Sequence, residues 1–118
     1  MTTVVVVDDH AGFRATACAL LALGGFGVVG EAASGAQTLD VIAALEPDVV
    51  LLDVQLPDVD GFAVTRELHA AGCATTVVLC SARNAADYGL QIDSCGAAGF
   101  ITKSALTAAA LWAIVGGS

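Results

Sequence analysis

Three carboxylates that could act together each follow an apolar, strand-like run of the sequence. Asp8 and Asp9 end the run "TTVVVVDD", and Asp53 ends the run "VVLLD". If the fold brings them together, their charges repel one another unless a positive group joins them. Mg²⁺ suits this arrangement because it prefers an octahedral set of oxygens, usually from one or two carboxylates together with waters and phosphate oxygens. With the ion bound, one carboxylate could attack phosphorus and form an aspartyl phosphate.

Two further polar side chains follow apolar runs later in the sequence and could complete such a site. Ser81 ends "TTVVLCS", and Lys103 follows "GFIT". An ammonium group could neutralise phosphoryl oxygens during an in-line transfer, and a hydroxyl group could hydrogen-bond the attached phosphoryl group. Taken singly, each residue has an ordinary interpretation: an acid pair that caps a helix, a serine in a turn, a lysine on the surface. Their joint occurrence at strand ends favours a site.

The segments that position these side chains alternate between β-branched runs and helical patterns. Such alternation makes an α/β fold, a doubly wound parallel sheet with helices on both faces, and ligands then bind outside the carboxyl ends of the strands. The helix over 84–95 is expected to be weak, because Gly89 costs about 1 kcal/mol relative to Ala inside a helix. We predict strands within 2–9, 27–32, 49–52, 75–82 and 97–104, and helices over 10–23, 34–45, 61–72, 84–95 and 104–115.

Two helix starts and one helix face can be predicted in more detail. Ser34 and Ser104 each precede a helical pattern, and serine is a favoured N-cap residue. Leu39, Ile42 and Leu45 recur at helical spacing and are expected to point into the core.

Composition limits the class of protein. The 118 residues fit one domain, 1–118, and 57% of them are hydrophobic, which indicates a globular chain. The formal net charge of −8 argues against binding to nucleic acid phosphates and favours capture of a cation. We expect a cytoplasmic protein with no membrane segment, since no apolar run is long enough to span a bilayer and no signal peptide is evident. Four cysteines without metal-binding spacing indicate buried thiols in a reducing compartment.

Taken together, these motifs make the whole chain resemble the receiver domain of two-component response regulators. The matching segments are "VVVVDDH", "VVLLDVQLPDVDGF", "VVLCSA" and "GAAGFITKS". The resemblance implies a five-stranded, flavodoxin-like sheet of order 2-1-3-4-5. It also implies a role for each matching position: Asp53 as phosphoacceptor, Asp8, Asp9, Asp53 and the backbone carbonyl of Gln55 as Mg²⁺ ligands, Lys103 and Ser81 as catalytic partners, and Ser81 and Phe100 as switch residues.

The resemblance further implies partners. A histidine kinase would supply the phosphoryl group, and the protein would catalyse only its own phosphorylation and slow dephosphorylation. The segments "DDH" and "GAAGFITKS" resemble the NarL/LuxR type, which joins a receiver to a helix-turn-helix domain. DNA would then be bound only through an output domain absent from this chain, with a homodimer as a further expected assembly. We expect the chain, which ends in "VGGS", to be a receiver from a longer transcription factor rather than a single-domain regulator.

Other interpretations remain open at this stage. A phosphatase that forms an aspartyl phosphate usually carries Asp-x-Asp, and here Gln55 takes the second position. A phosphorylation-independent interaction module could keep only the fold. A flavin carrier is disfavoured because the loop after the first strand lacks a glycine- and hydroxyl-rich phosphate cradle. Within the family, Gln55 and Arg83 occupy positions that tune the lifetime of the phosphoaspartate, and Ser104 stands where many receivers have proline.

Several residues are assigned no chemistry. The spacing Gly25-x-Gly27-x-x-Gly30 matches a dinucleotide fingerprint, but it follows a helix and leads into a strand, the reverse of the required order. Trp112 is predicted either to join the core or to face a partner. The residues taken as structural, solvated or turn-forming are His10, His69, Asp58 and Asp60.

Overall fold

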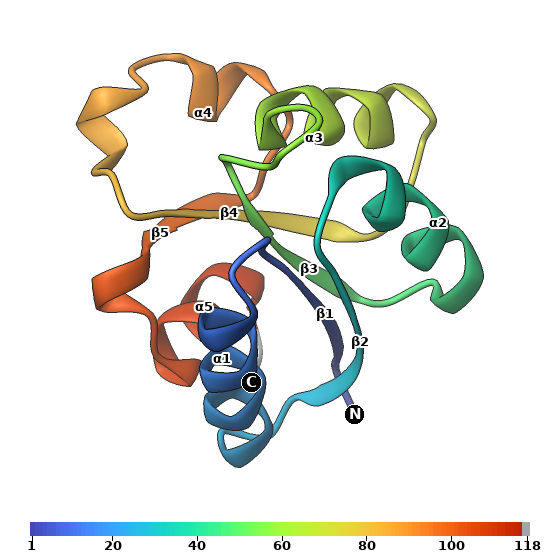
Figure 1. Ribbon diagram of the computed structural model, residues 1–118, viewed down its shortest axis with the longest axis vertical. Coiled ribbons are helices and arrows are strands. Elements are labelled where there is room, and N and C mark those ends of the chain that lie inside the picture. The colour runs from blue at the N-terminus through green and yellow to red at the C-terminus, as the bar shows by residue number, and fades with distance from the viewer. Residues whose placement is uncertain (117–118) are drawn as a thin grey trace.

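A parallel five-stranded sheet lies between two layers of helices in the computed structural model, which describes residues 1–116 (Figure 1). The strand order is β2-β1-β3-β4-β5, so the predicted α/β fold and strand order are confirmed. Helices α1 and α5 cover one face, and α2, α3 and α4 cover the other (Figure 1). The elements are β1 (Thr3–Val7), α1 (Ala11–Leu23), β2 (Gly27–Ala32), α2 (Gly35–Leu45), β3 (Val49–Asp53), α3 (Gly61–Ala70), β4 (Thr76–Ser81), α4 (Gln91–Ser94), β5 (Gly99–Thr102) and α5 (Ala108–Val115).

The apolar strands are buried on both faces because each face carries its own core. Side chains alternate along a strand, so neighbouring residues point to opposite layers. In β3, Val50 and Leu52 pack in the core that contains Phe62 of α3. Leu51 packs in the other core, with Leu111 of α5. Covering helices on both sides explain why β3 shows a continuous apolar run rather than alternation.

Parallel register brings the ends of the central strands to one edge of the sheet. Val7 at the end of β1 pairs with Leu52, the residue before Asp53. Asp53 in turn pairs with Cys80, the residue before Ser81. Ser81 pairs with Thr102, the residue before Lys103. The residues that follow these strands therefore emerge side by side.

Helix α5 begins later than predicted, and Ser104 is not its cap. Lys103–Ala105 form a single 3₁₀ turn, and Leu106 then takes an extended conformation with its side chain buried. The N-cap of α5 is Thr107, whose side chain accepts a hydrogen bond from the backbone N–H of Ala110. Burial of Leu106 delays the helix, because the extended backbone that directs this side chain inward cannot also be helical. The prediction for Ser34 is confirmed, since its hydroxyl accepts from the N–H of Gln37.

This difference between the two capping residues can be measured. We expect Thr107→Ala to lower the free energy of unfolding by about 1 kcal/mol, the usual cost of a lost N-cap. Ser104→Ala should change it by less than about half that amount, since Ser104 is exposed and caps no helix. Urea unfolding followed by circular dichroism measures both values. A larger loss for Ser104→Ala would contradict this description of the helix start.

The predicted helix over 84–95 is broken in the structure. Ala85–Asp87 form a 3₁₀ turn and Gln91–Ser94 a single helical turn. Between them Gly89 has φ +59°, a left-handed conformation that interrupts any continuous helix. Gly89 was correctly predicted to weaken this helix, but its effect is larger than predicted, because it ends the helix rather than weakening it.

Three further predictions can be compared with the coordinates. Leu45 was wrongly expected to point inward: it is 46% exposed at the last residue of α2, while Ile42 is buried. Trp112 belongs to the core, stacking on Phe26 at 3.9 Å between ring centroids and donating from Nε1 to the carbonyl oxygen of Gly24. The segment with the dinucleotide-like glycines ends α1 and begins β2, as expected.

The cysteines are all free thiols, and their burial differs. Cys80 and Cys95 are buried, whereas Cys18 and Cys73 are half-buried. Burial raises the pKa of Cys80 to about 12, so this thiol stays protonated and unreactive. Among residues 1–116, no helix is long and apolar enough to cross a membrane.

Candidate functional site

The polar side chains that follow β1, β3, β4 and β5 form a partly buried cluster at the carboxyl edge of the sheet. Asp8 is completely buried, and Asp53 and Ser81 are 3% and 1% exposed. The side chain of Lys103 is 17% exposed. Buried carboxylates are rare without a compensating charge, so this cluster requires a positively charged partner.

Lys103 supplies that compensating charge. Its Nζ lies 2.5 Å from Oδ2 of Asp8 and 3.3 Å from Oδ2 of Asp53. It also lies 4.6 Å from the ring centroid of Phe13, a cation–π contact from α1. Burial alone would lower the pKa of Lys103, but the Asp8 contact and the charge of Asp53 outweigh it and raise the pKa above its usual value. The ammonium is therefore charged at neutral pH.

The two buried carboxylates differ in their pKa. Burial, together with the charge of Asp8, raises the pKa of Asp53 to about 6, although the N–H of Gln55 and the Lys103 ammonium oppose this. Burial acts in the same direction on Asp8, but contacts with Lys103 and His10 outweigh it and lower its pKa. Near pH 7 both groups are therefore mostly ionised, and two negative charges share one ammonium group.

The donor set fits a hard divalent cation. Oxygens of Asp8, Asp9 and Asp53 and a ring nitrogen of His10 all lie within 4.8 Å of one another. Oδ2 of Asp8 is buried and contacts the Lys103 ammonium, but among residues 1–116 it has no partner with hydrogen-bond geometry. Neighbouring carboxylate oxygens are ligands that Mg²⁺ prefers. Gln55 lies next to the cluster, its N–H donating to Oδ1 of Asp53 at 3.1 Å.

His10 belongs to this cluster, which sequence reasoning did not anticipate. Its Nδ1 lies 3.0 Å from Oδ1 of Asp8 and 3.1 Å from Oδ1 of Asp9, while most of the side chain is exposed. The adjacency "DDH" was the available signal, but a histidine next to acids in sequence does not by itself turn its ring toward them.

Ser81 is hydrogen-bonded to a residue that the sequence did not single out. Its Oγ lies 2.6 Å from the hydroxyl of Tyr88 and accepts from the N–H of Arg83 at 3.1 Å. Tyr88 packs edge-on against Phe62 at 5.2 Å and at a tilt against Phe100 at 5.8 Å between ring centroids. Tyr88 thus contacts both the Ser81 hydroxyl and the ring of Phe100, which is half-buried in β5.

The loop after Asp53 is held by its own polar side chains. Asp58, expected only to form a turn, accepts hydrogen bonds from the N–H groups of Gly35 and Ala36 and so caps α2 from another loop. Asp60 caps α3 through the N–H of Ala63. A Cβ at Gly61 would lie 2.5 Å from the carbonyl oxygen of Asp53, so only glycine fits at this position. The segment following Asp53 therefore has a fixed path.

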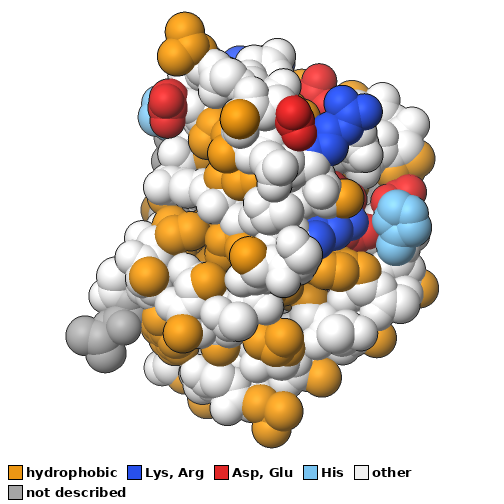
Figure 2. Space-filling view, turned by 90° about the vertical axis from the view of Figure 1, so that its left-hand side faces the viewer, with side chains coloured by type: hydrophobic (Ala, Val, Ile, Leu, Met, Phe, Trp, Pro, Cys, Tyr) orange, Lys and Arg blue, Asp and Glu red, His pale blue; other side chains and the backbone are white. Residues whose placement is uncertain are grey.

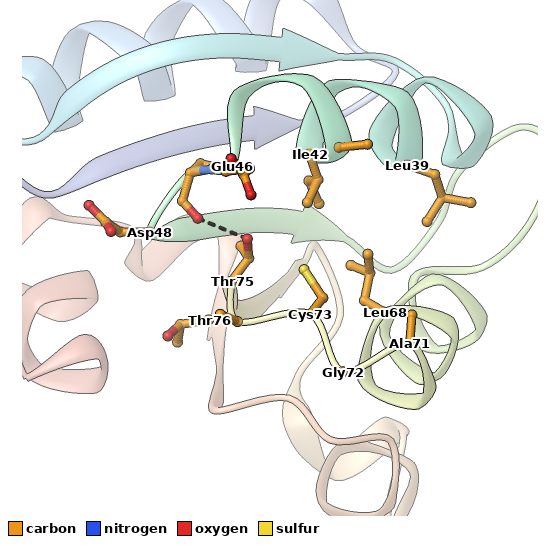
Figure 3. Close-up of a pocket in the computed structure, with 13 residues that line it drawn as sticks. Leu39, Ile42, Glu46, Asp48, Leu68, Ala71, Gly72, Cys73, Thr75 and Thr76 are labelled. Atoms are coloured by element: carbon orange, nitrogen blue, oxygen red, sulfur yellow. Dashed lines mark hydrogen bonds between the residues drawn. The ribbon is translucent and has the colours of Figure 1, made fainter.

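A cavity also lies away from this edge of the sheet. It has a volume of about 710 Å³ and lies between the C-terminal parts of α2 and α3, at the opposite end of the sheet (Figure 3). Leu39, Ile42 and Leu68 form its apolar wall, and Thr75 donates a hydrogen bond to the carbonyl oxygen of Pro47 at its edge (Figure 3). Its charged lining residues are acidic, so it has no group to neutralise a phosphate, and we do not assign the phosphate chemistry to it.

Charged side chains are unevenly distributed on the face shown in Figure 2. In Figure 2 the charged side chains gather along one side and at the top, and the remaining surface is largely neutral or hydrophobic. The sparse charge on this face is in keeping with the 14% of charged residues in the sequence.

Comparison with known proteins gives a consistent family. The family model for the response regulator receiver domain matches residues 4–115. The NarL transcriptional regulatory protein of Mycobacterium tuberculosis H37Rv is 43% identical over 101 residues, covering 85% of this chain and 47% of the relative. GacA of Pseudomonas viridiflava is 38% identical over 106 residues, covering 89% of this chain and 50% of the relative. This chain thus spans about half the length of these relatives.

A solved structure agrees with the sequence comparison. The signal receiver domain of NarL from Mycobacterium tuberculosis superposes with a TM-score of 0.90 at 37% identity, covering 99% of this chain and 98% of that one. A LuxR-family response regulator from Aurantimonas sp. SI85-9A1 superposes with a TM-score of 0.86 at 28% identity, covering 98% of this chain and 85% of that one.

Proposed function

This chain belongs to the response regulator receiver domain family of two-component systems, and from that premise we propose that Asp53 accepts a phosphoryl group from a histidine kinase. As a receiver domain it is not a conventional enzyme. The observation that carries the proposal is the contact of one ammonium group, Lys103 Nζ, with the buried carboxylates of both Asp8 and Asp53. An incoming phosphoryl group would add negative charge to this cluster. The Lys103 ammonium is the cation that would offset that added charge.

The acidic cluster is typical of a receiver metal site. We assign Mg²⁺ to Asp8, Asp9 and Asp53, with the backbone carbonyl of Gln55 as a further ligand. When bound, the ion would neutralise charge on the phosphoryl oxygens during transfer. Asp53 itself supplies the nucleophile: a carboxylate oxygen forms the bond to phosphorus while the bond from phosphorus to the kinase histidine nitrogen breaks. Lys103 then stays beside the new phosphoryl oxygens as their fixed positive partner.

Ser81 and Phe100 are the proposed switch residues. The Ser81 hydroxyl would hydrogen-bond a phosphoryl oxygen on Asp53, and Phe100 would turn inward as Ser81 moves. Phosphorylation biases such an equilibrium only as far as it binds one packing better than the other. The proposed readout is the face that runs from β4 to α5. Transcriptional output, DNA binding through another domain, a homodimer and a cytoplasmic location are part of this proposal, on the basis of the NarL and LuxR relatives.

The metal requirement gives a direct test. With a small acyl phosphate donor and Mg²⁺, we expect intact-mass spectrometry to find one added phosphoryl group that is labile in base. Chelation of divalent ions should abolish the product, because the uncompensated carboxylates would repel the donor. Phosphorylation that proceeds unchanged after chelation would remove the ion from the mechanism. If the folded protein takes up neither the phosphoryl group nor beryllofluoride, a phosphorylation-independent interaction module becomes the better proposal.

A further inference from the structure

Tyr88 is hydrogen-bonded to the hydroxyl group of Ser81, on which the proposed switch depends. Ser81 is 1% exposed, so its hydroxyl must find its hydrogen bonds within the protein. Those bonds go to Tyr88, at 2.6 Å, and to the N–H of Arg83, at 3.1 Å. Asp53 and Lys103 are not among the hydrogen-bond partners of Ser81 in the described residues.

A count of donors and acceptors shows whether the Ser81 proton is free to bind a phosphoryl oxygen. A serine hydroxyl has one proton and two acceptor lone pairs. Arg83 fills one lone pair of Ser81 Oγ. If Ser81 donates to Tyr88, its only proton is used; if Tyr88 donates, both lone pairs are filled and the Ser81 proton has no acceptor among the described residues. The first arrangement satisfies both groups, because the half-exposed Tyr88 can give its own proton to water. A phosphoryl oxygen therefore competes with Tyr88 for the Ser81 proton.

Tyr88 also contacts the elements that would move if its bond to Ser81 were broken. Its ring is held between Phe62 of α3 and Phe100 of β5. It directly follows the 3₁₀ turn Ala85–Asp87 and directly precedes Gly89, which has φ +59°. One hydrogen bond of Tyr88 thus joins the buried end of β4 to a segment that lacks a continuous helix, and its ring contacts the proposed aromatic switch residue.

We propose that Tyr88 is a positioning residue that withholds the Ser81 hydroxyl from the phosphoryl group until Asp53 is phosphorylated. The proposal rests on the function proposed above and assigns a restraint that neither Ser81 nor Phe100 provides alone. Phosphorylation exchanges the Tyr88–Ser81 bond for a bond between Ser81 and a phosphoryl oxygen. The segment around Tyr88 is then released from β4, while its ring can follow Phe100.

Removal of the phenol hydroxyl tests this exchange without removing the ring. In Tyr88→Phe, the phosphoryl oxygen no longer competes with a phenol hydroxyl for the Ser81 proton, but the packing of the ring on Phe62 and Phe100 stays. We expect the variant to bind beryllofluoride, with Mg²⁺ present, about two- to tenfold more tightly, the range that one net hydrogen bond corresponds to. Its affinity for Mg²⁺ alone should stay the same, because neither Tyr88 nor Ser81 lies in the carboxylate cluster. Both constants can be measured by titration calorimetry.

A double-mutant cycle separates this role from a merely structural one. In a Ser81→Ala background, Tyr88→Phe should leave beryllofluoride affinity unchanged, since the bond it removes no longer exists. Thr38→Val is the matched control: it removes another buried hydroxyl, which donates to the carbonyl oxygen of Ser34, and should not alter the affinity.

The outcomes distinguish the two proposals. If the wild-type protein binds beryllofluoride but Tyr88→Phe binds it equally or more weakly, the proposed restraint by Tyr88 is overturned. The proposal that Asp53 is phosphorylated still stands in that case. An equal gain in the Ser81→Ala background would also overturn it, because the gain would not pass through Ser81. If the folded wild-type protein binds none, the proposed function fails, and the restraint fails with it.

Discussion

Asp53→Asn is expected to abolish phosphorylation and at the same time to stabilise the fold at neutral pH. The amide cannot act as the nucleophile, so no phosphoryl group should be added. The stabilisation follows from the pKa of Asp53, which burial raises to about 6. In the folded protein the ionised form of this residue is disfavoured, and asparagine removes the negative charge that Asp8 repels. Near pH 7.5, without divalent ions, we expect a gain of about 1–3 kcal/mol in the free energy of unfolding.

The pH dependence of this gain has a definite sign. Between the unfolded pKa near 3.8 and the folded pKa of about 6, the folded state holds more protons at Asp53 than the unfolded state does. The stability of the wild-type protein therefore falls as pH rises through this window. The advantage of Asp53→Asn should shrink as pH is lowered from about 7.5 to about 4.5, where the wild-type carboxyl group is itself neutral.

Urea unfolding at several pH values measures this prediction. Asp40→Asn is the matched control, because it removes one exposed carboxylate of a chain with net charge −8 and tests the effect of total charge alone. A gain for Asp40→Asn as large as that for Asp53→Asn would assign the effect to overall repulsion. A loss of stability in Asp53→Asn near pH 7.5 would contradict the charge balance described for the site.

Lys103→Met is expected to cost about 3–5 kcal/mol in the free energy of unfolding near pH 7.5 without divalent ions. The substitution leaves the carboxylates of Asp8 and Asp53 buried without their shared cation, and such loss of one partner is strongly destabilising. The cost should be smaller near pH 5, because Asp53 can then take up a proton. Phosphorylation by an acyl phosphate should be lost or slowed at least about a hundredfold.

Mg²⁺ should partly reverse the destabilisation of Lys103→Met. Without the ammonium group the carboxylates have only the ion to compensate them, so we expect the ion to raise the melting temperature of the variant more than that of the wild-type protein. Arg66→Met, which removes an exposed cation from α3, is the control and should behave as wild type. A Lys103→Met protein as stable as wild type in the presence of a chelator would show that Lys103 does not balance these charges.

Sequence reasoning predicted the sheet and the main acidic residues because both depend on local patterns. The apolar runs are short and bounded by Gly, Pro or acids, and parallel strands bring their carboxyl ends to one edge whatever the details of packing. The sequence alone therefore predicts that Asp8, Asp53 and Lys103 lie together, and the structure brings them into contact.

The features that were missed depend on tertiary contacts or on a choice between similar residues. Ser104 and Thr107 are both acceptable N-caps, and burial of Leu106 decides between them. Tyr88 lies in the segment 84–95, for which the sequence predicts only a weak helix, and nothing in the sequence indicates that its hydroxyl reaches Ser81. Its ring position depends on aromatic residues from two other elements, Phe62 and Phe100.

We propose that the carboxylate at position 53 receives the phosphoryl group. Borohydride reduction of the phosphorylated protein converts an aspartyl phosphate to homoserine, and tandem mass spectrometry of the peptide that ends at Arg66 then locates the change. We expect homoserine at position 53 and at no other acid of that peptide, with none formed in Asp53→Asn. Homoserine at Asp40, Asp58 or Asp60, or an undiminished yield from Asp53→Asn, would contradict the account.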